Sequence, residues 1–142
     1  MSTTVVDASV IARCLIPGSG KAEARRRLPG MQPIIAPALI YPECGNALWK
    51  QARQDSLQSE LVEELLRDLM RIPIRTLPLR RLTPLALRLA VRHVHPIYDC
   101  YYLAAAILND CELATADKRL AELAREVGLG DRVILIGESP AR

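Results

Sequence analysis

Short apolar runs alternate with longer amphipathic segments along the whole chain. Five runs are brief, and most of them are rich in Val or Ile, which is typical of buried strands. They predict strands at residues 3–6, 33–36, 72–79, 111–115 and 132–136. The segments between them carry apolar residues at helical spacing. They predict helices at residues 8–16, 21–28, 39–54, 83–94, 99–109 and 117–127. Alternating strands and helices predict an α/β fold with a parallel sheet covered on both faces.

Capping residues and prolines indicate where several helices begin. Ser56 is expected to cap one more helix, in which leucines recur at helical spacing. Thr83-Pro84 is expected to begin the next one, because proline suits the first helical position. Residues 100–108 are apolar on every side of their helix. That helix is expected to be central in the fold or shared with a second subunit.

Length and composition place the chain among ordinary globular proteins. At 142 residues and 50% hydrophobic, it is expected to form one domain over residues 1–142, with no disordered or collagen-like part. It has no apolar run long enough to cross a membrane and no signal peptide, so we expect a cytoplasmic protein with no membrane partner. The four cysteines show no paired spacing and are expected to be reduced, without a zinc site.

The basic residues are nearly all arginine. Of 19 basic residues, 16 are Arg and 3 are Lys, and the formal net charge is +3. The guanidinium fork suits phosphate, but a GC-rich genome would produce the same bias, and both explanations remain open. The chain has no Phe and few aromatic residues. Base stacking is therefore expected to contribute little to nucleic-acid binding, unless Tyr98, Tyr101 or Tyr102 is exposed.

Four carboxylates stand where a charge is costly without a partner. Asp7 follows the first predicted strand, and Asp117 lies two residues beyond the fourth. Glu43 lies in an apolar helix, and Asp99 begins another. Taken singly, the three aspartates also fit helix caps, and Glu43 fits an exposed helix face. If the four converge, they repel one another unless some are protonated or a cation neutralises them. Carboxylate oxygens suit Mg²⁺ or Mn²⁺, which promote phosphodiester hydrolysis without a covalent intermediate.

Four segments together resemble a known family. They are Val5-Val6-Asp7-Ala8-Ser9-Val10, residues 37–49 with Glu43 and Asn46, residues 98–104 with Asp99, and residues 114–120 with Thr115 and Asp117. In this order they resemble the PIN-domain ribonucleases, and among them the VapC-type toxins of type II toxin–antitoxin pairs. The resemblance implies a three-layer α/β/α sandwich with a central parallel sheet. It also implies a Mg²⁺- or Mn²⁺-dependent endoribonuclease acting on RNA, a homodimer, and a small antitoxin partner.

The resemblance maps the acidic site onto the four carboxylates. Asp7, Glu43, Asp99 and Asp117 are then the catalytic and metal-binding residues. Ser9 and Thr115 match hydroxyl positions of the family, and Asn46 lies one helical turn after Glu43. All three are expected to hold carboxylates in place. Five basic residues are candidates for binding RNA phosphates, namely Arg13, Lys50, Arg53, Lys118 and Arg119.

Other functions fit the sequence less well. A phosphatase of the Asp-x-Asp type needs an acid where Ser9 stands, and a receiver domain needs paired early acids and a late lysine. A PIN nuclease of RNA processing and a catalytically silent RNA- or protein-binding PIN module are the remaining alternatives. His93 and His95 are left out of the site, because a metal-dependent nuclease needs no histidine base.

Overall fold

Five parallel strands form the centre of the molecule. The computed structural model describes residues 3–55 and 59–137. Its strands are β1 (Thr4–Val6), β2 (Ile34–Pro37), β3 (Ile74–Leu77), β4 (Glu112–Thr115) and β5 (Val133–Leu135). Their spatial order is β3-β2-β1-β4-β5, and every neighbouring pair is parallel. Each strand lies where the sequence predicts it, and the parallel sheet confirms the predicted α/β class.

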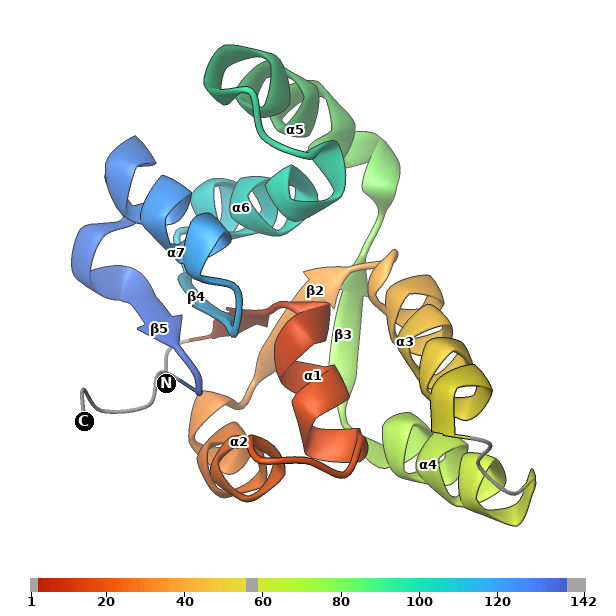
Figure 1. Ribbon diagram of the computed structural model, residues 1–142. Helices are drawn as coiled ribbons and strands as arrows, with labels where there is room; N and C mark the ends of the chain where they lie inside the picture. Colours follow the sequence, from red (N-terminus) through yellow and green to blue (C-terminus); the bar gives the residue numbers. More distant parts are fainter. Residues whose placement is uncertain (1–2, 56–58, 138–142) are drawn as a thin grey trace.

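Helices cover both faces of this sheet. They are α1 (Ala8–Leu15), α2 (Lys21–Arg27), α3 (Ile40–Asp55), α4 (Ser59–Arg71), α5 (Leu79–His93), α6 (Ile97–Asn109) and α7 (Lys118–Ala124). Single turns of other helix types follow at Leu28–Met31, Arg125–Leu129 and Gly130–Arg132. Figure 1 shows α1 to α4 on one side of the sheet and α5 to α7 on the other. The fold is therefore the expected three-layer α/β/α sandwich.

The order in which strands are added to the sheet reverses between β1 and β4. From β1 the chain moves outward through β2 to β3, whereas from β4 it moves the opposite way to β5. The two strands pair in register, with Val6 opposite Ala114. Beyond this pair, the Asp7 backbone N–H donates to the carbonyl of Ala114 at 2.9 Å. Open α/β sheets bind their ligands at the carboxyl end of such a reversal, because the connections diverge there and leave a crevice.

The apolar helix α6 is the centre of the core. Cys100 and residues 102–106 have no exposed surface in the single chain. The helix contacts β1, β2 and β4 on one side and packs against α5 on the other. Of the two predicted alternatives, the central position in the fold is therefore the one found for these residues. All four cysteines are buried and free, as expected for reduced thiols.

The prediction that Thr83-Pro84 begins a helix is wrong. α5 begins at Leu79, and Pro84 lies inside it. Thr83 Oγ1 donates to the Leu79 carbonyl at 2.8 Å and lies 2.6 Å from Tyr101 Oη, so it ties α5 to α6. The earlier start is favoured because it buries Leu82, which is only 2% exposed.

Two other helix boundaries were predicted, of which one differs from the structure and one cannot be compared with it. The last helix was expected to reach residue 127, but α7 ends at Ala124 and a wider turn follows, in which Gly128 has a φ of 112°. The predicted cap at Ser56 lies outside the described residues. Within residues 3–55 and 59–137, no helix combines the length and apolar character needed to span a membrane.

Candidate active site

Asp7 is held by two hydroxyl groups at the end of β1. Its Oδ2 atom accepts hydrogen bonds from Ser9 Oγ at 2.7 Å and from Thr115 Oγ1 at 2.8 Å. Each hydroxyl in turn accepts a backbone N–H, from Ala116 at 2.9 Å for Ser9 and from Asp117 at 3.0 Å for Thr115. A hydroxyl that accepts an amide proton has its own proton free to donate. Both therefore donate to the same carboxylate oxygen, and Oδ1 is left for another ligand.

The Asp7 carboxyl group is buried and has acidic neighbours. Burial raises its pKa to about 6, the hydrogen bonds from Ser9 and Thr115 oppose that rise, and the charges of Asp99 and Asp117 add to it. A buried carboxylate beside like charges is costly unless it binds a proton or a cation. The position therefore favours a positively charged ligand.

Glu43 enters the site from the first turn of α3. Its Oε1 atom accepts a hydrogen bond of 2.6 Å from the Tyr102 hydroxyl, which α6 carries into the core. Burial raises the Glu43 pKa, and the charges of Asp7 and Asp99 raise it further, whereas the Tyr102 bond lowers it. Burial and Glu43 raise the Tyr102 pKa well above its usual range, so its hydroxyl stays protonated and donates.

Asp99 lies in the first turn of α6 and is not a helix cap. The cap position is Pro96, and the Asp99 Oδ2 atom lies 2.9 Å from His95 Nε2 instead. The His95 side chain is only 7% exposed. The sequence analysis left His95 out of the site, and the structure shows that it contacts one of the four acids. The spacing of four residues between His95 and Asp99 is the sequence signal of this contact, but His95 was considered for the site only as a general base.

Asp117 caps α7, as one alternative predicted. Its Oδ1 atom accepts the backbone N–H groups of Arg119 at 2.9 Å and Leu120 at 3.4 Å. Asp7 stands at the corresponding position of α1 but makes no such bond. Capping therefore accounts for the place of Asp117 but not for that of Asp7 or Asp99. Asp117 still lies close enough to Asp7 for its charge to raise the Asp7 pKa.

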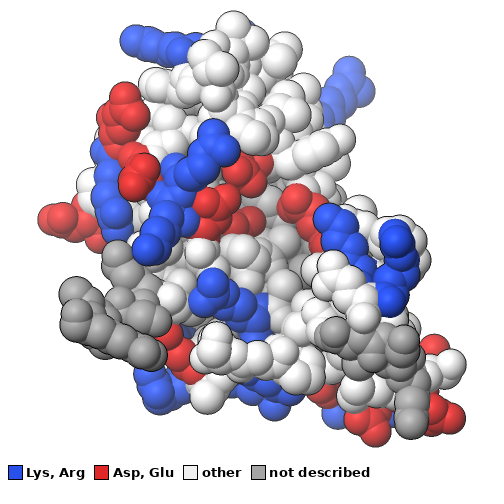
Figure 2. Space-filling model, viewed as in Figure 1, with Lys and Arg blue, Asp and Glu red and all other residues white. Residues whose placement is uncertain are grey.

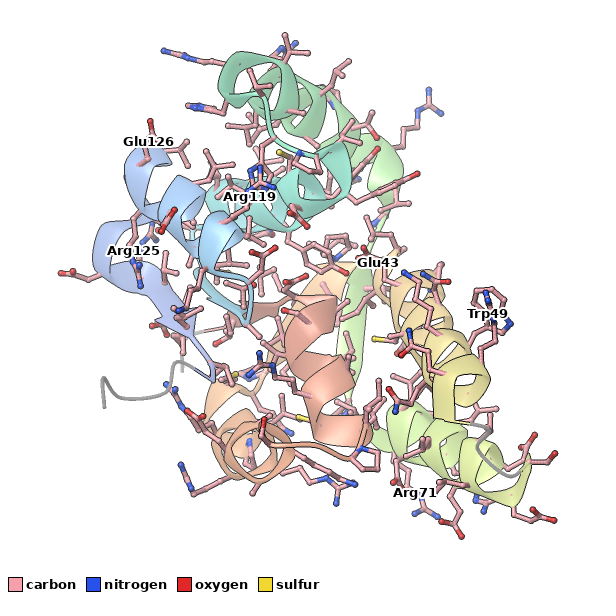
Figure 3. All side chains as sticks on the ribbon, in the orientation of Figure 1. Glu43, Trp49, Arg71, Arg119, Arg125 and Glu126 are labelled. Carbon is pink, nitrogen blue, oxygen red and sulfur yellow. The ribbon has the colours of Figure 1, made fainter. Side chains whose placement is uncertain are left out.

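The four acids face one region at the carboxyl edge of the sheet. Asp7 interacts electrostatically with Asp99 and Asp117, and Glu43 interacts with Asp7 and Asp99. Figure 2 shows acidic side chains gathered in a hollow at the centre of one face, between α3 and the α6–α7 side. Figure 3 shows Glu43 at the edge of α3 nearest this hollow. Repulsion among four converging carboxylates requires a counter-charge.

The donor atoms suit a hard divalent cation. All four candidate ligands are carboxylates, and carboxylate oxygens are the preferred ligands of Mg²⁺ and Mn²⁺. As their side chains stand, no three acidic, histidine or cysteine residues of the described part of the chain form a ready-made metal site. The carboxylate chemistry of the set and the repulsion among its charges nevertheless fit such an ion.

Asn46 and Tyr98 lie beside Glu43. They line an open cavity of about 300 Å³ together with Glu43, Leu39 and Pro42. Among the described residues, the Asn46 side chain has no hydrogen bond to any of the four acids. Tyr98 is 64% exposed, which satisfies the condition set for base stacking, whereas Tyr102 is fully buried.

The five candidate RNA contacts lie in three different places. Lys118 and Arg119 are exposed in the first turn of α7, and Figure 3 shows Arg119 between α7 and α6. Lys50 and Arg53 are exposed on α3, beyond Glu43. Arg13 lies against Gly20, and it lines a separate cavity with residues 16–21. The exposed pairs on α7 and α3 therefore flank the acidic hollow from two sides.

Comparison with known proteins agrees with this arrangement. The family model of the PIN domain matches residues 4–126, a segment that contains all four acids. The chain belongs to the PIN-domain family. This PIN domain is 31% identical over 120 residues to "Ribonuclease VapC3" of Pyrobaculum aerophilum, covering 83% of this chain and 92% of that protein. That relation places it among the VapC-type members.

A solved structure supports the same fold. The crystal structure of PAE2754 from Pyrobaculum aerophilum matches this PIN domain with a TM-score of 0.67 and 25% identity. The match covers 86% of this chain and 79% of that one. The three-layer architecture predicted from the family resemblance is thereby confirmed.

Proposed function

We propose that this PIN domain is a metal-dependent endoribonuclease that hydrolyses RNA phosphodiester bonds. The observation that carries the proposal is the convergence of four acidic side chains at the reversal between β1 and β4. The relation to a ribonuclease over most of both chains supports the choice of RNA as substrate. A silent binding module would have no use for a buried, charge-crowded Asp7, because replacing it with a neutral side chain would stabilise the fold.

Asp7, Glu43, Asp99 and Asp117 would hold the cation, Mg²⁺ or Mn²⁺. Once bound, such an ion lowers the pKa of a water molecule and stabilises charge on the attacked phosphate. The protein orients the carboxylates that bind it. Ser9 and Thr115 fix the rotamer of Asp7, and Tyr102 fixes that of Glu43.

The basic residues bind the RNA on either side of the acids. Lys118 and Arg119 stand on the α7 side, and Lys50 and Arg53 stand on the α3 side. Lys and Arg contacts to phosphate position a nucleic acid without reading its sequence. They also offset the repulsion between the acidic hollow and the RNA backbone.

The proposed activity is tested with purified protein and a structured RNA. Cleavage is expected with Mg²⁺ or Mn²⁺, none with excess chelator, and none for Asp99→Asn at any metal concentration. Calorimetric titration with Mn²⁺ separates a nuclease from a silent module. Heat of binding that disappears in Asp99→Asn supports the nuclease, whereas no heat at millimolar metal together with no cleavage would overturn it.

We further propose that this nuclease is a cytoplasmic toxin that forms a homodimer and is inhibited by a small antitoxin. Its VapC-type relation supports the toxin and the antitoxin. Exposed apolar side chains on one helix, Leu87 and Val91 of α5, support a protein partner on that side. Induced expression is expected to arrest growth, with relief by Asp99→Ala, and sedimentation equilibrium is expected to give twice the chain mass. Normal growth at full expression would contradict the proposed toxin, and a monomer at micromolar concentration would contradict the proposed homodimer.

A further inference from the structure

Trp49 is an exposed aromatic side chain beside two cations. It is the only tryptophan of the chain, and 55% of its surface is accessible. The guanidinium carbon of Arg53 lies 4.9 Å from the centroid of its ring. Trp49, Arg53, Lys50 and Gln54 line an open cavity of about 440 Å³ on α3. Figure 3 shows the Trp49 side chain pointing outward from α3, away from the sheet.

The composition of this patch distinguishes it from a protein interface. The cores of protein interfaces are apolar and poor in lysine. Exposed apolar side chains that suit such a core lie on other helices, Leu87 and Val91 on α5 and Leu66 and Met70 on α4. The charged residues that line the cavity with Trp49, by contrast, are Lys50 and Arg53, both positive. An aromatic ring among cations is the arrangement that binds single-stranded nucleic acid, where bases stack and phosphates pair with the cations.

The patch continues from the acidic hollow along one helix. Trp49 follows Glu43 by six residues, which is about 9 Å along the axis of α3. Asn46 lies between them and lines the Glu43 cavity. Figure 2 shows basic side chains over α3 directly beside the acidic hollow. Trp49 therefore lies within the reach of a few nucleotides from the four acids.

We propose that Trp49, Arg53 and Lys50 form a subsite that binds an unpaired nucleotide of the RNA flanking the cleaved phosphate. Arg53 covers one face of the indole, the base stacks on the other, and Lys50 pairs with a phosphate. The subsite rests on the proposed ribonuclease function and adds a requirement for a single-stranded segment next to the cleavage point. Base stacking on Trp49 was not expected from the sequence, where only the three tyrosines of α6 were considered.

The single tryptophan makes the contact directly measurable. Wild-type protein in excess chelator, which prevents cleavage, is titrated with a short single-stranded RNA while the tryptophan emission is followed. Stacking is expected to quench the emission. The same RNA annealed to its complement, and an RNA of equal length with abasic sites, are expected to bind without quenching, because neither offers an unstacked base. Quenching by all three RNAs equally, or by none, overturns the proposal.

Substitutions give a second readout through binding and cleavage. Trp49→Ala is expected to weaken binding of the single-stranded RNA between about 5-fold and 150-fold, and Trp49→Phe is expected to restore most of it. Lys50→Gln should reduce the slope of log affinity against log salt by about 0.7. Met70→Ala, which trims a 63% exposed side chain on α4, is the matched control and should change neither quantity.

The outcomes separate this subsite from the nuclease function itself. If wild type quenches with RNA but cleaves nothing in Mn²⁺, the subsite stands and the proposed nuclease fails. If Trp49→Ala cleaves RNA with unchanged KM, and RNA leaves the tryptophan emission of the wild-type protein unchanged, the nuclease stands and the subsite fails. If Trp49→Ala leaves RNA binding unchanged but converts a dimer to a monomer, the patch is a protein interface and the proposal is overturned.

Discussion

The acidic site has two sides that are built differently. On the sheet side, Asp7 is buried, and hydroxyls held by backbone groups at the end of β4 fix it in place. On the helix side, Glu43 and Asp99 belong to the first turns of α3 and α6, and each carboxylate has one side-chain partner. Helices α3 and α6 lie on opposite faces of the sheet, whereas β1 and β4 are neighbours within it.

This difference indicates that one side of the site is held rigidly and that the other can shift slightly. The sheet side cannot move without breaking the pairing of β1 with β4. The helix side depends on how the two outer layers pack, and packing tolerates small shifts of a helix. We therefore expect the loss of a side chain that positions a carboxylate to reduce cleavage more on the sheet side than on the helix side. The predictions below test that ranking.

Asp7→Asn is expected to have the largest effect on activity. Asn keeps the shape and can still accept the bonds from Ser9 and Thr115, but it removes the charge that faces the cation. RNA cleavage should fall to the level of RNA without protein, while circular dichroism stays unchanged. Cleavage at the wild-type rate would exclude Asp7 from the catalytic residues and reverse the ranking of the two sides.

The same substitution should change how stability depends on pH. The Asp7 pKa is about 6 in the folded, metal-free protein and near 4 in the unfolded chain. The folded state therefore binds more protons between these values, and its stability falls as pH rises through this interval. The contribution of Asp7 protonation to the free energy of unfolding is complete below about pH 4 and lost above about pH 6, and it amounts to roughly 2–3 kcal/mol. Urea unfolding in chelator should show this fall for wild type and a flatter profile for Asp7→Asn.

Thr115→Val is expected to have the next largest effect. It removes one donor to Asp7 and the acceptor of the Asp117 backbone N–H, at a fully buried position. The free energy of unfolding should fall by about 1–3 kcal/mol, and kcat by up to about 100-fold. Thr115→Ser is the matched control, since it retains the hydroxyl, and it should recover most of the activity. Equal losses in both variants would mean that the methyl group matters and the hydroxyl does not.

Tyr102→Phe tests the helix side through Glu43. Loss of the phenol removes the bond that lowers the Glu43 pKa, so the pKa should rise further. If Glu43 acts as a carboxylate, the acid limb of the pH–rate profile should move to higher pH, and kcat near neutral pH should fall by about tenfold. A uniform loss at every pH, without a shift of the limb, would indicate a packing defect instead.

His95→Ala is expected to have the smallest effect. It frees the Asp99 side chain, which is already partly exposed, and should lower cleavage by only a few-fold. His93→Ala, two residues away in the last turn of α5, is the matched control and should leave cleavage unchanged. A loss of cleavage for His95→Ala as large as that for Thr115→Val would show that positioning matters equally on the helix side and on the sheet side.

The strands and the sheet-side acids were predictable because their signals are local. A short β-branched run marks β1 and a short, mostly apolar run marks β4, and in a parallel sheet their carboxyl ends must share one edge. Asp7 follows β1 directly and Asp117 lies two residues beyond β4, so their approach could be inferred without knowing how any helix packs. The hydroxyls of Ser9 and Thr115 stood within two residues of these acids and came with the family resemblance.

The helix-side partners were not predictable in the same way. Tyr102 and Glu43 are 59 residues apart, and their contact depends on how α3 and α6 pack across the sheet. His95 was close to Asp99 in sequence, but only the start of α6 at Ile97 brings the two together. Trp49 was given no role in the sequence analysis, and only the structure shows it exposed beside Arg53.

The two hydroxyls that donate to Asp7 have a consequence for acidic conditions. Because both end on Oδ2, the proton that Asp7 takes up near pH 6 has to settle on Oδ1. That is also the oxygen left for the proposed cation, so a proton and that cation would compete for a single atom. Mild acidification should therefore raise the concentration of divalent cation needed for half-maximal cleavage while leaving the fold intact. The two hydroxyl side chains that donate to Asp7 would thus make the activity sensitive to acid.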